Sequence, residues 1–240
     1  MTAPGRRAEP SWLATDDLAR ELFQGVGLGA AVFGAALAGL CLFGASLETA
    51  SPASAGVIAS AALFDLTIAL AQEGVFRGAL LFWLRSQAPS RGRALPAAMT
   101  SSLAFAVIHL GAAETTPARL AGLFAFGMVA SALTLRRSTI WPAVGFHAAW
   151  NLLLGAVLQG PGAPPLRLAM VIRLRDGLWD GGRAGFEGSP AVIALLALLA
   201  WRLRPCRGAS GPDQGSDAVA PRQSLEAALD GRGFPGGGDT

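Results

Sequence analysis

Six polar residues inside long apolar runs carry side chains that hydrolytic chemistry needs. A glutamate or histidine can take a proton from water, and a histidine or asparagine can donate hydrogen bonds to a developing negative charge. These residues fall in three separate runs and include both histidines of the chain: Gln72, Glu73 and Arg77; His109; His147 and Asn151. The members of two pairs, Glu73 with Arg77 and His147 with Asn151, are four positions apart, which puts each pair on one helix face.

The surrounding composition indicates a membrane protein. Of the 240 residues, 52% are hydrophobic and 15% are charged, and the mean hydropathy is +0.46, which is more apolar than a soluble domain needs. An ionisable group at bilayer depth costs about 2.5–3.5 kcal/mol, so each one requires a partner or a function. A purely structural alternative stays open, in which Glu73 and Arg77 neutralise one another and each histidine is a neutral polar link between helices.

Apolar runs predict the elements that position these residues. Most of them are near the ~20 residues that a helix needs to cross the hydrocarbon. The runs lie at 22–45, 56–84, 96–113, 118–135, 139–159 and 190–201. The second is long enough to require tilt or extension beyond the membrane, and the last is short. The expected fold class is all-α, a polytopic transmembrane helical bundle of about six spans.

The basic residues, nineteen arginines, orient this bundle. Thirteen of them flank the runs on one side, which the positive-inside rule assigns to the cytoplasm, so both termini are expected there. A cleavable signal peptide is the alternative for the first run, because Ala53-Ser54-Ala55 resembles a cleavage site, but the run is too long for such a peptide. The arginines lie between apolar runs rather than in a stripe, so no nucleic-acid partner is expected.

The expected organisation has three parts. Residues 1–21 form a cytoplasmic N-terminal segment, residues 22–204 form the transmembrane domain, and residues 205–240, which lack apolar periodicity, form a disordered cytoplasmic tail. Counted from the cytoplasmic ends of their runs, Glu73, His109, His147 and Asn151 fall within a layer of roughly 8 Å at ~1.5 Å per residue. One shared, water-accessible site is therefore geometrically possible.

Three ordered motifs resemble a known family. Gln72-Glu73-Gly74-Val75-Phe76-Arg77, Phe105-Ala106-Val107-Ile108-His109 and His147-Ala148-Ala149-Trp150-Asn151 are similar to the EExxxR, FxxxH and HxxxN motifs of the CPBP family. These are the CAAX-processing and bacteriocin-processing intramembrane proteases, also called Abi proteins. The resemblance covers residues 56–160 and implies a CAAX-protease-like bundle. It also implies a water-mediated endopeptidase, in which the first Glu and the FxxxH histidine activate water while the last His and Asn stabilise the oxyanion.

One position departs from this pattern. The first Glu of the motif is Gln72, which cannot act as a general base, so Glu73, assisted by His109, is the remaining candidate within reach. An ion pair with Arg77 makes Glu73 a poorer base, whereas partial desolvation acts in the opposite direction. Asp65 lies some 10 Å along the helix axis from Gln72, too far to replace the missing base directly.

Several functions remain open. The leading one is an intramembrane endopeptidase acting on a peptide or protein substrate at the membrane, in a bacterial inner membrane. The alternative is an inactive relative that binds or sequesters a membrane peptide or partner, in an immunity or scaffold role, and a transporter is a third. Members of the family are often called metalloproteases, and zinc held by His109, His147 and Glu73 is possible, but the resemblance favours a metal-independent mechanism.

Overall fold

The computed structural model describes residues 13, 17–49, 52–87, 94–112, 115–159, 170–173, 179 and 181–204. Within this part of the chain the predicted helical bundle is confirmed, and each helical segment begins and ends within a few residues of its predicted run. In chain order they are α1 (Leu18–Leu42); α2 (Ala55–Glu73) continued by η2 (Gly74–Leu81) and α3 (Phe82–Ser86); α4 (Ala94–Val107) continued by η4 (Ile108–Gly111); α5 (Pro117–Arg137); α6 (Trp141–Val157); and α7 (Pro190–Leu203). The predicted tail at 205–240 and most of the predicted segment at 1–21 lie outside the described residues.

Side-chain caps fix the starts of three helices. Ser54, Thr116 and Ser189 each accept a hydrogen bond from the backbone N–H three residues on, at the starts of α2, α5 and α7. In α5 and α7 a proline follows the cap. Its fixed φ angle is helical, and its missing N–H would have had no partner within the helix. Helix α5 ends in the left-handed residue Ser138, so only three residues connect it to α6.

The chain is a multi-pass membrane protein by the length and composition of its helices. Among the described residues, four continuous helical segments are long and apolar enough to span a bilayer: Leu18–Leu42, Ala55–Ser86, Ala94–Gly111 and Pro117–Arg137. Large apolar side chains on α2 and α4 point outward, as lipid-facing residues do, including Leu63, Phe64, Leu103 and Val107. Helix α7 has 14 residues and reaches about 21 Å, less than the ~30 Å hydrocarbon core.

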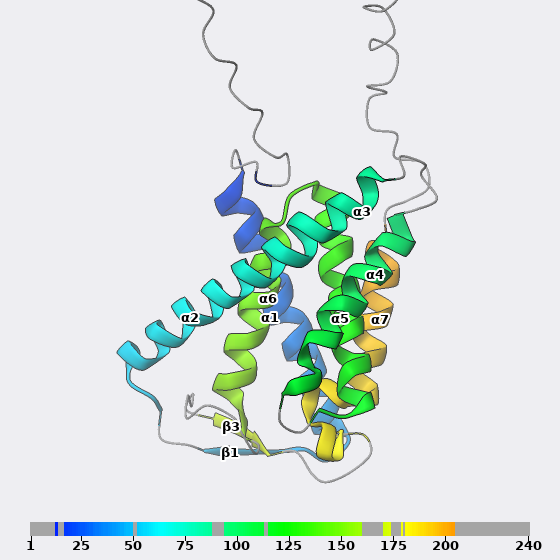
Figure 1. The fold of residues 1–240 in the computed structure, drawn as a ribbon. Helices are drawn as coiled ribbons and strands as arrows, with labels where there is room; N and C mark the ends of the chain where they lie inside the picture. Colours follow the sequence, from blue (N-terminus) through cyan, green and yellow to red (C-terminus); the bar gives the residue numbers. More distant parts are fainter. Residues whose placement is uncertain are drawn as a thin grey trace, which may run out of the picture. The chain divides into compact units, whose positions relative to one another are not determined.

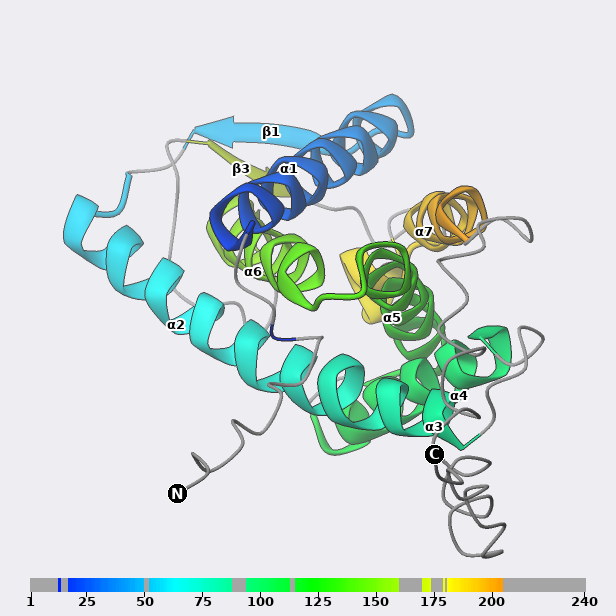
Figure 2. The same cartoon turned by 90° about the horizontal axis from the view of Figure 1, so that it is seen from above.

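The long second segment is tilted. Helices α2 and α3 form one oblique rod that crosses the more upright α5, α6 and α7 (Figure 1). Seen along the other direction, α6 lies between α1 on one side and α2 on the other (Figure 2). Helix α6 is therefore enclosed by the bundle, and the residues on its face toward α2 are shielded from lipid.

Glycines let α1 and α6 touch backbone to backbone. A Cβ atom added at Gly25 would lie 2.2 Å from the Pro142 carbonyl oxygen, and one added at Gly145 would lie 2.1 Å from the Leu22 carbonyl oxygen. Gly29 is similarly close to the carbonyl oxygen of Phe146, the residue before His147. Gly25 and Gly29, four positions apart, thus allow the close approach that fixes the position of α6 against α1.

A small sheet joins two loops, a feature that the sequence did not predict. The strands β1 (Ser46–Thr49), β3 (Met170–Arg173) and β2 (Leu158–Gln159) lie in that order, with β1 antiparallel and β2 parallel to β3. It connects the chain after α1 with the chain after α6, and so joins the C-terminal ends of the two helices, whereas the glycine contacts lie near their starts.

Candidate active site

A buried carboxylate lies at the centre of the candidate site. Oε1 of Glu73 accepts a hydrogen bond from NH1 of Arg77 at 3.1 Å and lies 2.7 Å from Nδ1 of His147. The side chains of Glu73 and Arg77 are 0% exposed, and that of His147 is 4% exposed. A fully buried carboxylate needs a cation and donors to compensate its lost hydration, and these two residues supply both.

The second oxygen of this carboxylate is not satisfied by the protein. Oε2 of Glu73 is buried and has no hydrogen-bond partner among the described residues. Buried polar atoms are nearly always paired with protein or ordered water, so an orphaned carboxylate oxygen marks a position where a water or a substrate proton is expected. The two oxygens of Glu73 therefore differ: Oε1 is anchored, and Oε2 is available.

Arg77 is held in place by α5 and by an aromatic ring. Its NH2 group donates to the Gly127 carbonyl at 3.0 Å, and its guanidinium carbon lies 4.7 Å from the centre of the Phe105 ring. A Cβ added at Gly127 would lie 3.0 Å from that NH2 nitrogen and 2.9 Å from Cβ of Ser102. The missing side chain at Gly127 thus makes room for the arginine.

The segment that follows Glu73 is a π-helix. Residues Gly74–Leu81 adopt this wider winding, in which backbone bonds run to the fifth residue and the ordinary ladder is interrupted. The Phe76 carbonyl accepts a hydrogen bond of 2.7 Å from the Ser101 hydroxyl of α4. The π-helix therefore lies within the EExxxR-like motif, and the Ser101 hydrogen bond attaches this segment to α4.

Aromatic rings surround both histidines. The ring of His147 makes edge contacts with Phe105 and Phe126, at centroid distances of 5.7 and 5.1 Å. The ring of His109 lies 5.0 Å from the same Phe105 ring. Phe105 is the first residue of the FxxxH-like motif, and here it touches Arg77, His109 and His147 together.

His109 has one nitrogen fixed and is half-buried. It lies in the 3-10 turn η4 at the end of its span, and its Nδ1 is 2.8 Å from the Phe105 carbonyl. Because a carbonyl oxygen only accepts, Nδ1 is the donor in this contact, which leaves Nε2 for other partners. Thr115 donates to the His109 carbonyl at 2.8 Å and fixes the turn from the other side.

Gln72 and Asn151 are half-buried, and within the described part of the chain neither side chain makes a hydrogen bond. Asn151 follows His147 by one turn on α6, as predicted from its spacing. Gln72 precedes the enclosed Glu73 and is the more accessible of the two adjacent side chains. Their amide groups are thus free to contact another molecule.

Some of the predicted site residues contact Glu73 directly, and others contact it only through an intervening residue. Glu73 faces Arg77 and His147, whereas His109 reaches the cluster through the shared Phe105 ring. The roles of Gly127 and Phe126 were not predicted, because nothing in an apolar run distinguishes a glycine that clears space or a phenylalanine that packs on a histidine. Asp65 lies eight residues before Glu73 on α2 and is half-buried.

The candidate ligand side chains are not arranged to bind a metal ion. Across the described residues, no group of three or more His, Cys, Asp or Glu side chains is placed to hold one. Of the three candidate zinc ligands, Glu73 and His147 bind each other, and the Nδ1 of His109 is turned toward a backbone carbonyl. Arg77 already supplies positive charge beside the carboxylate, which opposes a second cation there.

Comparison with known proteins covers the part of the chain that forms this site. Residues 54–153 match the family model described as type II CAAX prenyl endopeptidase Rce1-like. The match includes all three motifs and confirms the resemblance to the CPBP intramembrane proteases. Neither the curated proteins nor the solved structures gave a significant match.

Proposed function

Because residues 54–153 match the model of the Rce1-like family of type II CAAX prenyl endopeptidases, we propose that this chain is an intramembrane endopeptidase with Glu73 as its general base. It hydrolyses a peptide bond of a peptide or protein substrate near the membrane by activating water at a Glu/His site. The observation that carries this proposal is the unequal use of the Glu73 carboxylate, whose Oε1 is anchored by Arg77 and His147 while Oε2 is unpaired.

The proposed mechanism assigns a role to each side chain. A water bound at Oε2 of Glu73 gives its proton to the carboxylate, assisted by Nε2 of His109. The resulting hydroxide attacks the carbonyl carbon of the scissile bond, and the carbonyl oxygen becomes negative. Hydrogen bonds from the His147 ring and from the Asn151 amide stabilise that oxygen. The proton then passes to the leaving nitrogen as the carbon–nitrogen bond breaks.

In this mechanism no step uses a metal ion. Arg77 and His147 both contact the Glu73 carboxylate, hold it in position and compensate its negative charge. A metal ion would otherwise share this task. A site enclosed by Phe105 and Phe126 also strengthens these electrostatic interactions, because it excludes bulk water.

A single substitution tests the proposal. Glu73→Gln keeps the shape of the side chain but removes the base, so cleavage of a prenylated CAAX-type peptide by the purified protein should fall by ~10²–10⁴ or more. Glu21→Gln is the matched control, because Glu21 is also buried and accepts a hydrogen bond from Thr139 outside the site. Cleavage is measured by mass spectrometry at equal protein amounts. Undiminished processing by Glu73→Gln would end the assignment.

A catalytically inactive, peptide-binding role is the second candidate, and one observation favours it. The motif position that leads in the family is the accessible amide Gln72, whereas the remaining carboxylate, Glu73, is fully enclosed by its ion pair. In that case Glu73→Gln leaves the biological role intact, whereas bulky Trp substitutions at the buried Ala148 or Ala106, next to His147 and Phe105, abolish it.

A further inference from the structure

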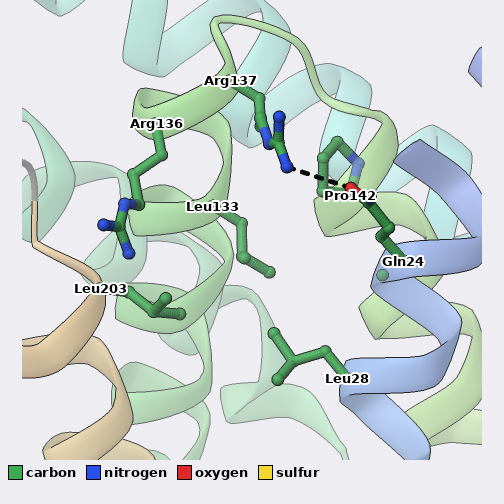
Figure 3. Close-up of a pocket in the computed structure, with 8 residues that line it drawn as sticks. Gln24, Leu28, Leu133, Arg136, Arg137, Pro142 and Leu203 are labelled. Carbon is green, nitrogen blue, oxygen red and sulfur yellow. Dashed lines mark hydrogen bonds between the residues drawn. The ribbon is translucent and has the colours of Figure 1, made fainter. Parts of the chain in front are cut away.

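A pocket with basic side chains lies at one end of the bundle, apart from the candidate active site. Its volume is about 410 Å³, and it is lined by residues of four helices. These are Gln24, Gly25 and Leu28 of α1; Leu133, Arg136 and Arg137 of α5; Pro142 of α6; and Leu203 of α7. Figure 3 shows the two arginines at its rim, with the leucines from three helices around its interior. We call this the basic pocket.

The rim of the basic pocket has unused hydrogen-bond donors. Arg137 donates from NH2 to the Gln24 side chain at 3.1 Å, which leaves most of its donors free. Arg136 is exposed and, in the part of the chain that the structure describes, has no hydrogen-bond or ion-pair partner. Among the residues that the structure describes, no Asp or Glu lines the pocket. Two guanidinium groups without a counterion favour a doubly coordinated oxyanion such as a phosphate.

The interior of the basic pocket is apolar. Leu28 and Leu203 are half-buried, and Leu133 is buried beneath the arginines. The floor at Gly25 is bare backbone, where α1 and α6 touch. A free phosphate ion would leave this apolar part empty, whereas a molecule with a phosphate at one end and a hydrocarbon chain at the other would fill both parts.

The location of the basic pocket also matches a membrane surface. It is formed by the last turn of α5, the first turn of α6, the last turn of α7 and the early turns of α1. Helix ends that carry arginine are expected at the cytoplasmic interface, where anionic lipids are concentrated.

We propose that the basic pocket binds one anionic phospholipid, with its phosphate between Arg136 and Arg137 and the start of an acyl chain along Leu28, Leu133 and Leu203. The bound lipid bridges α1, α5 and α7, and so stabilises the bundle beside the helix pair that positions His147. This site is independent of the peptidase proposal, because none of the lining residues belongs to the candidate active site.

The test measures lipid binding by the purified full chain in detergent. Phosphatidylglycerol and phosphatidylcholine are titrated separately, bound lipids are counted by native mass spectrometry, and thermal unfolding is recorded. The wild type should bind one phosphatidylglycerol in preference to phosphatidylcholine and unfold at a higher temperature when it is bound. Arg136→Gln and Arg137→Gln should each weaken phosphatidylglycerol binding roughly fivefold.

Arg85→Gln is the matched control, since Arg85 is likewise an exposed arginine in the last turn of a helix, α3, but does not line the pocket. Its phosphatidylglycerol binding should equal that of the wild type. Leu28→Trp fills the apolar part while keeping the charge, and should reduce lipid binding without changing the response to inorganic phosphate.

Three results would overturn the proposal. One is equal binding of the two lipids by the wild type. Another is an equal loss of binding in Arg85→Gln and in the pocket variants, which would show a general charge effect. The third is stabilisation by inorganic phosphate as strong as that by phosphatidylglycerol together with no effect of Leu28→Trp, which would make the pocket a site for a free anion.

Discussion

His147 and Glu73, 74 positions apart in the chain, are joined by a hydrogen bond of 2.7 Å between Nδ1 and Oε1. The contact joins α6 to the end of α2, and Arg77 binds the same carboxylate oxygen. The position of the base candidate thus depends on two helices at once. A displacement of either helix would separate the pair, so the distance between Glu73 and His147 depends on how α2 and α6 pack in the bundle.

The two histidines should be close enough to crosslink. Both rings pack on Phe105, with centroid distances of 5.0 and 5.7 Å, so cysteines at positions 109 and 147 should be joined by a short bifunctional reagent. The native Cys41 and Cys206 are first replaced by Ser. A 109–136 cysteine pair serves as the control, because Thr115 places the start of α5 beside His109 and position 136 lies in the last turn of that helix. Crosslinked protein is detected after protease cleavage between the two cysteines. Repeated failure in a folded variant would contradict the shared site.

Restoring the family carboxylate should preserve or raise activity. Gln72→Glu puts a base at the position to which the resemblance assigns water activation, and this side chain is half-buried rather than enclosed. The reaction rate is compared with that of the wild type on the same peptide. Since Glu73 remains in its ion pair, the double variant Gln72→Glu/Glu73→Gln then shows which carboxylate acts. If that double variant is as inactive as Glu73→Gln alone, Glu73 is the base.

A methyl group at Gly127 should damage the site. Its Cβ would lie 2.9 Å from Cβ of Ser102 and 3.0 Å from NH2 of Arg77, so Gly127→Ala should displace the arginine and destabilise the protein by about 1–3 kcal/mol, the usual range for overpacking. Gly34→Ala in α1 is the control, because a Cβ there meets nothing within 4 Å. Thermal unfolding and peptide cleavage are measured for both. Equal behaviour of the two variants would show that Gly127 is not a spacer.

Reporter fusions test the orientation inferred from the arginines. Fusions at residues 88–94 and after residue 207 should report the cytoplasm, and fusions at residues 165–185 should report the opposite side. Arg85 and the pair Arg136 and Arg137 follow the second and fourth spans, which is the basis of this assignment. External exposure of residues 88–94 would reverse the orientation, including the leaflet in which the basic pocket lies.

The helices were predictable because each one is a long apolar run with recognisable ends. Ser54, Thr116 and Ser189 are capping residues at three starts, and their effect is local, so it can be read without knowing the fold. The small sheet was not predictable in the same way. Its strands have two to four residues and are held by long-range pairing, such as Ser46 with Arg173, which leaves no periodic pattern in the sequence.

Within the site, spacing identified the polar residues but not their partners. The separation of four between Glu73 and Arg77 predicted their pairing, which depends on one helix alone. The choice of His147 rather than His109 as the partner of Glu73 depends on how α6 and α4 pack against α2. The π-helix after Glu73 and the space beside Gly127 also arise from packing between helices, so they required the three-dimensional structure.

The glycine contact between α1 and α6 has a consequence for biosynthesis. Helix α1 leaves the ribosome first, but its most extensive partner is synthesised more than a hundred residues later. Until α6 is synthesised, the α1 backbone at Gly25 and Gly29 has no helix packed against it, and the earlier spans lack the helix that they enclose in the folded protein. The final docking of α6 also brings His147 to Glu73. Docking of α6 against α1 and assembly of the candidate site are therefore the same late event in the synthesis of the chain.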